Sequence, residues 1–472
     1  MLSKGPPALL ASLLPLFLGL GAGAPPPALA QAPETRPEPP WPPPPPPTTI
    51  PSTAPPEFTR PEGPGLRPAA TIELHPSVRL SEEYSDNFNQ SARDEQDNLR
   101  TILSPGLLAL INAAMVKGQV GYTLSGVHDS STGDTNLFHS LLGHVGWGAT
   151  PRLRLSASDV LTRSDEPARA DQLNLRQGRR TFTSNAFGLT ADYLVANIGT
   201  QGSYRLTTFF DEEGADTVSH AFGVGASTTF YRTNTASLGY EYLTSETSGP
   251  RDPRALGGAG DSDTTRHQFT ASLTRELTST FSAGVTGSYA LYTQTGGALA
   301  GETDSTLWNI SLFTAYALPG RLSLNGTTGV GRLESDSGES SVLFTTATTL
   351  TYWFARATAT VGVDQGFSPT FAAGENFGIV KTRGFRGSLS YPFTPFISGS
   401  GSAFFRTNEF TGVGGGEADR SEDTWGGAIS FSVRLLRWLS LGLEYAYTEA
   451  SSSESFRSFS ENRARASLSA AW

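Results

Sequence analysis

The stretch that decides the fold class runs Leu439-Ser-Leu-Gly-Leu-Glu-Tyr-Ala-Tyr447, near the end of the chain. Successive side chains of a β-strand point to opposite faces, so this alternation puts every Leu and Tyr on one face and the small or polar residues on the other. The same period of two recurs in residues 281–291 and 429–435. No long pattern with the helical period of 3.6 stands out after residue 69, so the sequence predicts an all-β protein.

The connections between these alternating segments have two lengths. Tight turns such as Leu318-Pro-Gly320 alternate with long polar loops. The long loops include residues 85–97, 163–178, 247–263, 294–303 and 409–423. The intervening segments predict twenty strands: 69–84, 98–111, 117–128, 136–148, 152–163, 179–193, 197–210, 217–230, 234–246, 264–276, 280–293, 304–317, 320–333, 340–353, 356–367, 378–391, 395–408, 423–435, 438–449 and 459–472. Strict alternation of short turns and long loops is typical of a transmembrane antiparallel up-and-down β-barrel, which we predict over residues 69–472 with about 18–20 strands.

Composition fits a barrel better than a soluble array of domains. Only 37% of the 472 residues are hydrophobic, whereas soluble domains use roughly 45–50% apolar residues. A barrel wall needs apolar side chains on its lipid-facing side alone, which explains the low fraction. The absence of cysteine excludes disulfides and thiolate zinc sites. A net charge of −10 with only three lysines argues against a nucleic-acid partner.

The first 68 residues read as an export signal followed by a spacer. Leu9–Leu20 is an apolar run of 12 residues, shorter than the roughly 18 residues that a spanning helix needs. Ala28-Leu29-Ala30 has the form of a signal-peptidase site, so we predict a cleaved signal peptide at 1–30. Of the 36 residues from 33 to 68, 16 are proline, which predicts a disordered, extended periplasmic linker at 31–68. The linker acts either as an inert spacer or as an arm that contacts a partner.

The last predicted strand carries an assembly cue. Its outer face has Ala464, Ala466, Leu468, Ala470 and Trp472, ending in a terminal aromatic residue. This resembles the C-terminal signal that the bacterial outer-membrane barrel assembly machinery reads, with Leu468, Ala470 and Trp472 as its residues. Ala470 departs from the pattern, since a bulky aromatic is usual at that position. The resemblance implies that the assembly machinery is a partner.

A family resemblance lies in the first predicted hairpin. Its residues are Ile72–Leu80, Glu83–Asn87, Asp97–Leu99 and Leu103–Gly106. They resemble the opening of the outer-membrane β-barrel porins that accompany exopolysaccharide export systems, over residues 72–110 only. The resemblance implies nearer 18 strands, a location in the outer membrane of a Gram-negative bacterium among lipid and lipopolysaccharide, an anionic or neutral polysaccharide as cargo, and a periplasmic polysaccharide co-polymerase as partner. It does not assign a particular substrate.

The face opposite the apolar one predicts the residues that line a lumen. They are Arg154, Arg205, Glu241, Arg266, Arg356, Asp364, Arg386, Arg406, Arg434, Glu444, Arg463 and Arg465. Nine of these twelve are arginine in an acidic chain, which favours a channel for an anionic or hydroxyl-rich polymer, because guanidinium groups fork onto carboxylates and phosphates. The alternative is that these arginines pair with lumenal or loop acids and merely fill water-facing positions.

The sequence also argues against an enzyme. Of its six histidines, His139 and His144 share a strand but differ by five residues, so they point to opposite faces. We expect no catalytic residue, no metal site and no cofactor, although Asp86 with Asp97 or Asp211 with His220 could be drawn as an acid–base pair. Two alternatives to polysaccharide export remain: a structural or adhesive barrel with a closed lumen, and a general diffusion porin for small solutes. Loop 163–178 or 247–263 is the candidate for an inward-folded constriction.

Overall fold

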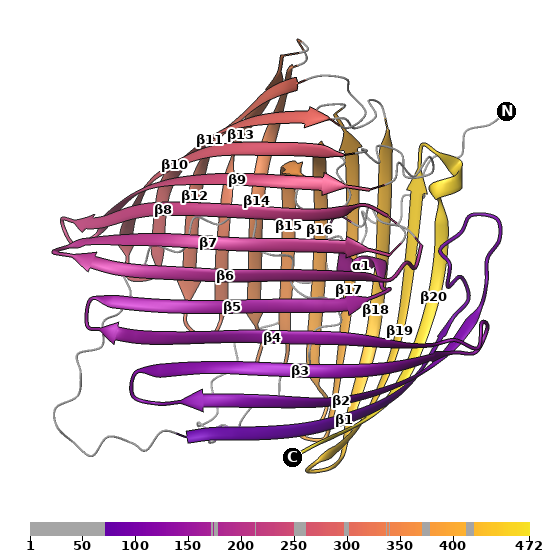
Figure 1. Ribbon diagram of the computed structural model, residues 1–472. Coiled ribbons are helices and arrows are strands. Elements are labelled where there is room, and N and C mark those ends of the chain that lie inside the picture. The colour runs from indigo at the N-terminus through magenta and orange to yellow at the C-terminus, as the bar shows by residue number, and fades with distance from the viewer. Residues whose placement is uncertain are drawn as a thin grey trace, which may run out of the picture. The chain divides into compact units, whose positions relative to one another are not determined.

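The computed structural model describes residues 71–170, 173, 178–212, 214–249, 261–296, 302–336, 338, 340–370, 378–411 and 420–472. These residues form one sheet of twenty strands that closes on itself (Figure 1). The strands are β1 (Thr71–Ser85), β2 (Asn98–Asn112), β3 (Val116–Asp129), β4 (Thr135–Thr150), β5 (Leu153–Ser164), β6 (Phe182–Val195), β7 (Ile198–Asp211), β8 (Asp216–Phe230), β9 (Asn234–Ser248), β10 (Ser262–Thr278), β11 (Phe281–Gly296), β12 (Glu302–Leu318), β13 (Leu322–Ser335), β14 (Ser340–Trp353), β15 (Thr358–Pro369), β16 (Ile379–Pro392), β17 (Ile397–Phe410), β18 (Ser421–Leu436), β19 (Leu439–Ser452) and β20 (Phe459–Ala471). The helices are short: α1 (Pro167–Ala170) and the 3₁₀-helix η2 (Ser455–Arg457).

Each strand pairs antiparallel with the next, and β1 closes the ring by pairing with β20 from Ser77↔Ala471 to Ser85↔Arg463. The predicted all-β antiparallel barrel is therefore confirmed. All twenty predicted strands are present, with ends that differ by three residues or fewer. The count is twenty, two more than the family resemblance implies. The predicted signal peptide and linker lie outside the described residues.

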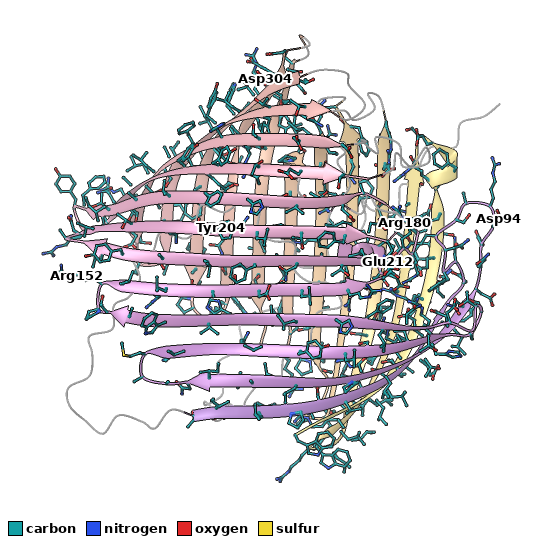
Figure 2. All side chains as sticks on the ribbon, viewed as in Figure 1. Asp94, Arg152, Arg180, Tyr204, Glu212 and Asp304 are labelled. Carbon is teal, nitrogen blue, oxygen red and sulfur yellow. The ribbon has the colours of Figure 1, made fainter. Side chains whose placement is uncertain are left out.

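The two ends of the barrel differ in their connections. At one end, here called the short-turn end, connections hold two to four residues, such as 151–152 between β4 and β5. The left side of Figure 1 shows this end for the front strands, and Figure 2 shows Arg152 there. At the opposite, long-loop end the connections include 86–97, 165–181 and 249–261. Arg180 and Glu212 lie at this end (Figure 2).

The pairing register separates an outer from an inner face. Residues directly opposite each other in neighbouring strands share a face. Following the ladders round the ring places Leu103, Leu238 and Ile310 on the outer face, where they are 51%, 68% and 59% exposed. Such an apolar surface around the whole barrel is far larger than a soluble monomer exposes. The closed ladder also satisfies the strand backbone without water, as a lipid environment requires.

Among the described residues, no helix is long and apolar enough to cross a membrane.

Three outward-facing tyrosines on the apolar surface each pair with a histidine. Tyr122, Tyr204 and Tyr240 each place their hydroxyl on the Nδ1 of a histidine nearer the long-loop end, at 2.7, 2.9 and 2.9 Å. The three partners are His139, His220 and His267. The ring of each tyrosine thus covers the apolar side and its hydroxyl meets a polar group, as expected at a membrane–water interface.

The wall overlaps itself between β14 and β15. Pairing of these strands stops at Thr346↔Gln365, although β15 continues to Pro369. Beyond that point, Phe367 and Ile379 pack against Leu333, an inner-face residue of β13. Gly331 leaves room for this approach, since a Cβ there would lie 3.4 Å from Phe367 Cδ2. The ends of β15 and β16 nearest the long-loop end therefore lie against the inner side of the wall, and we call this contact the β14–β15 overlap.

Candidate channel lumen

The inner face changes character along the barrel axis. Toward the short-turn end, inner-face side chains such as Lys117, Arg154 and Arg434 are exposed. Toward the long-loop end, inner-face side chains are buried: Glu83 is 2% and Asn408 0% exposed. We call these two regions the lower and upper lumen. The lower lumen is lined by water-accessible groups, whereas these side chains of the upper lumen are packed against other parts of the protein.

The register puts eleven of the twelve candidate lumen residues on the inner face. These are Arg154, Arg205, Glu241, Arg266, Asp364, Arg386, Arg406, Arg434, Glu444, Arg463 and Arg465. Arg356 is the exception. The prediction that it belongs to a strand, 356–367, is wrong. Strand β14 ends at Trp353, β15 begins at Thr358, and Phe354 N donates to Ala357 O at 2.7 Å across the tight turn between them. The part that the eleven play in transport stays a prediction.

The eleven residues divide by their partners. Arg463 and Arg465 bind carboxylates of the upper lumen, Arg266 binds Glu241, and Arg406 lies 3.9 Å from Asp364. Other arginines stand apart from such pairs. No ion pair among the described residues includes Arg154, Arg205, Arg386 or Arg434. Neutralisation by acids therefore accounts for the upper arginines, and the lower ones keep their charge toward water.

Loop 165–181 fixes itself to the inner wall through buried ion pairs. Arg100 on β2 binds Asp165 at the start of the loop and Asp129 at the end of β3. The side chains of Arg100 and Asp129 are only 5% and 6% exposed. A buried guanidinium needs such carboxylates, because its charge is costly away from water. The loop is thereby drawn toward β2 and β3 on the inside of the barrel.

A second set of ion pairs ties the same loop to β20. The Glu166 carboxylate accepts from Arg179 Nη1 at 2.8 Å and from Arg463 Nη1 at 2.9 Å. Arg179 also reaches Glu461 at 3.1 Å. Burial alone would raise the pKa of Glu166, but the guanidinium groups of Arg179 and Arg463 outweigh it and hold that pKa well below its usual range. Glu166 is therefore ionised and both its arginine partners are charged.

Loop 86–97 also contacts the arginines that hold loop 165–181. Phe88 contacts two guanidinium groups, with its ring centroid 4.3 Å from Arg100 Cζ and 4.6 Å from Arg179 Cζ. Its carbonyl oxygen also accepts from Arg179 Nε at 3.0 Å. Stacking on an aromatic face suits the planar, weakly hydrated guanidinium. Phe88 therefore orients both arginines as well as filling the upper lumen.

Loop 165–181 also reaches the far wall. Asn408 Nδ2 on β17 donates to Leu173 O at 2.9 Å. Leu173 packs against Val380 of β16 and Phe410 of β17. Strands β16 and β17 lie across the ring from β5 and β6 (Figure 1). At Leu173, loop 163–178 thus reaches the inner wall on the far side, whereas most of 247–263 lies outside the described residues. That either loop forms a constriction stays a prediction.

The C-terminal residues sit at the short-turn end. Leu468 and Ala470 are on the outer face of β20, and Leu468 is 41% exposed. Trp472 stacks on Trp438, with ring centroids 6.1 Å apart and planes at 12°, and its backbone N donates to Pro76 O at 3.1 Å. Their role as an assembly signal stays a prediction.

Asp211 and His220, considered from sequence as an acid–base pair, are not brought together. His220 is on the outer face, while Asp211 is buried on the inner face, at the end of β7. Asp86 accepts from the backbone and side chain of Asn462. Within the described ranges, no three His, Asp or Glu side chains are grouped as metal ligands.

Sequence analysis missed several residues of the upper lumen. Glu83, Arg100 and Glu461 occupy alternate inner-face positions of their strands, so the rule that found Arg463 could have found them. Glu166 lies in a loop, where no periodicity indicates which way a side chain points, and Arg179 lies in the same loop although the predicted strand 179–193 begins there.

Comparisons with known proteins give distant structural matches and no match by sequence. No protein-family model matches the sequence, and no curated protein matches it. The outer membrane protein OpdK of Pseudomonas aeruginosa is similar at 14% identity and a TM-score of 0.40, over 85% of this chain and 99% of that one. The ferric enterobactin receptor PfeA of the same organism gives 11% identity and a TM-score of 0.46, over 85% and 81%. The FrpB iron transporter of Neisseria meningitidis gives 10% and 0.47, over 84% and 81%. At these values, the fold assignment rests on the strand pairing given above.

Proposed function

We propose that the chain is an outer-membrane channel of a Gram-negative bacterium through which small anionic solutes diffuse. Its signal peptide is cleaved after Ala30, and its long loops face the outside of the cell. The observation that carries the proposal is the set of exposed inner-face arginines with no ion pair among the described residues: Arg154, Arg205, Arg386 and Arg434. Fixed positive charge in a water-filled lumen raises the local concentration of anions and repels cations.

The upper lumen supports a limit on solute size. A ring of twenty strands is wide enough for an aqueous channel. Loop 165–181 and the β14–β15 overlap both occupy that width toward the long-loop end. We propose that a passage remains beside them, and such a passage suits small solutes better than a chain of sugar residues. No chemical step is needed for this role, and we propose no enzymatic activity.

Polysaccharide export is the second candidate. The resemblance of residues 72–110 favours it, and so does a hydroxyl-rich inner wall on β10 to β12, where Ser272, Ser288 and Ser311 stand on the inner face. A polymer would require loop 165–181 to leave its contacts on β17 and β20. Under this candidate, a periplasmic co-polymerase is the partner, and the cargo is an anionic or neutral polysaccharide.

Planar-bilayer conductance of refolded Gln31–Trp472 tests the proposal. We expect open steps with anion selectivity and no block by long oligosaccharides added from either side. Open steps that are blocked in proportion to the length of anionic oligosaccharides would favour the polysaccharide conduit. Open steps without charge selectivity would favour a general porin, and a correctly folded barrel without conductance would favour the structural or adhesive alternative.

A further inference from the structure

Glu166 occupies a position that a solute carboxylate could take. Its Oε2 atom accepts from two guanidinium groups at once, Arg179 Nη1 at 2.8 Å and Arg463 Nη1 at 2.9 Å. The two arginines come from different parts of the chain, one from the end of loop 165–181 and the other from β20. Arginine is used wherever proteins recognise carboxylates and phosphates, and two guanidinium groups that converge on one carboxylate oxygen offer such a group several strong hydrogen bonds.

We propose that Arg179 and Arg463 form a binding site for the carboxylate of a solute, and that Glu166 fills this site when no solute is bound. The inference rests on the proposed function, because it needs an anionic solute in the lumen. Exchange of one carboxylate for another keeps the charge of the cluster unchanged. The guanidinium groups remain paired throughout, so the exchange avoids the cost of an unpaired buried charge.

The two arginines are held in place by groups other than Glu166. Arg179 also binds Glu461 at 3.1 Å and donates through Nε to Phe88 O at 3.0 Å. The Phe88 ring lies against the same guanidinium at 4.6 Å. Arg179 therefore keeps its position when Glu166 moves away. Such preorganisation lowers the entropic cost of binding a solute.

Solvent reaches this site from the side of Glu166. The Glu166 and Arg463 side chains are 18% and 13% exposed, against 3% for Arg179. Arg465 lies two residues further along the inner face of β20 toward the short-turn end and is 33% exposed. A line of guanidinium groups thus leads from the lower lumen to the position of Glu166. An entering carboxylate meets Arg465 first and Arg463 next.

The test is block of anion current by succinate in planar bilayers, with neutral succinamide as the matched probe. We expect E166Q to bind succinate about tenfold more tightly than the unmodified chain, because the competing internal carboxylate is gone. R463Q should bind it about tenfold more weakly, and R463K should fall between the two because an ammonium cannot fork. E82Q changes an outer-face carboxylate of β1 near the long-loop end, and it should leave the affinity for succinate unchanged.

Opposite shifts in E166Q and R463Q are what distinguish a ligand site from a structural ion pair. If both substitutions shift succinate affinity in the same direction, or if succinamide blocks equally well, the inference is overturned. Heat-modifiable migration on electrophoresis checks that each variant is a folded barrel. Should the unmodified chain fail to conduct, the proposed function fails. The site would then still be tested by calorimetric titration of succinate into folded E166Q and R463Q, with the same ranking expected.

Discussion

Arginine stands on the inner wall in both halves of the barrel, but under opposite conditions. In the upper lumen, Arg100 is 4% exposed and binds two carboxylates. In the lower lumen, Arg386 and Arg434 are exposed and have no ion pair among the described residues. The same residue type therefore holds protein together in one half and presents charge to water in the other. Burial decides which, because a guanidinium that loses water needs carboxylates.

The lengths of the connections create this difference. Only the long-loop end has enough chain to fold back into the barrel, as loops 86–97 and 165–181 do through Phe88 and Leu173. The turns at the opposite end hold two to four residues, which suffices to reverse direction and no more. An arginine near the short turns therefore stays in water.

Removing a buried arginine should destabilise the barrel far more than removing an exposed one. Arg100→Gln leaves Asp129 and Asp165 facing each other without their shared cation. We expect a loss of about 3–5 kcal/mol, the usual cost of an uncompensated buried charge. Arg386→Gln should change stability by less than about 0.5 kcal/mol. Urea unfolding of the refolded protein in detergent, followed by tryptophan fluorescence, measures both.

Equal effects of these two substitutions would contradict the contrast between the halves. A triple variant that combines Arg100→Gln with Asp129→Asn and Asp165→Asn provides a further check. It removes the cluster without leaving one sign of charge behind, so part of the lost stability should return.

The β14–β15 overlap offers a second test of how the upper lumen is filled. Phe367→Ala removes the ring that lies against Gly331 and Leu333. We expect a loss of about 2–3 kcal/mol for a partly buried aromatic, together with larger single-channel conductance. Phe344→Ala, on the outer face of β14 and 54% exposed, is the matched control and should leave conductance unchanged. Bilayer recording of the two variants at one salt concentration decides between them.

Most of the fold could be predicted from the alternation of side chains and of connection lengths. Both are local properties, since a strand alternates whatever it pairs with. The strand ends were the least certain, as Arg356 shows: its place in a four-residue turn depends on where β14 stops pairing. The β14–β15 overlap has no sequence signal, because Phe367 follows the outer-face pattern and only the tertiary structure carries it inside.

The candidate site divides in the same way. Strand position alone indicates that Arg386, Arg406 and Arg463 share a face. Whether each is paired depends on which loop folds inward, and that depends on contacts between distant parts of the chain such as Leu173 with Asn408. Periodicity carries no information about loops, so Glu166 could not be assigned to the inner cluster. Arg179 begins the predicted strand 179–193, but β6 starts only at Phe182, so its direction depends on the loop as well.

Acid should weaken the upper lumen through Glu166. Its pKa is held below the usual value of about 4.3, so its contribution to stability is fully present above about pH 5. That contribution is lost as pH falls through the ordinary value toward the lowered one. At neutral pH, the free energy of unfolding of the unmodified chain should exceed that of E166Q by about 1–2 kcal/mol, and the two values should converge in strong acid. Thermal unfolding of both at several pH values from 8 to 3 checks this, and a constant gap would contradict it.

The smallest expected effect belongs to the lower arginines taken one at a time. A single charge about 10 Å from a passing ion in water changes its energy by about 0.4 kcal/mol, which is roughly a factor of two in permeability. Arg386→Gln or Arg434→Gln should each lower the anion-to-cation permeability ratio by about that factor. The effect should shrink in concentrated salt, where screening is stronger. Arg275→Gln, which removes an outer-face charge of β10, is the matched control and should leave the ratio unchanged. Reversal potentials under a salt gradient measure the ratio. If the two lower arginines behaved like Arg275, the lumen would owe its selectivity to the upper cluster, and the two halves would differ in stability but not in transport.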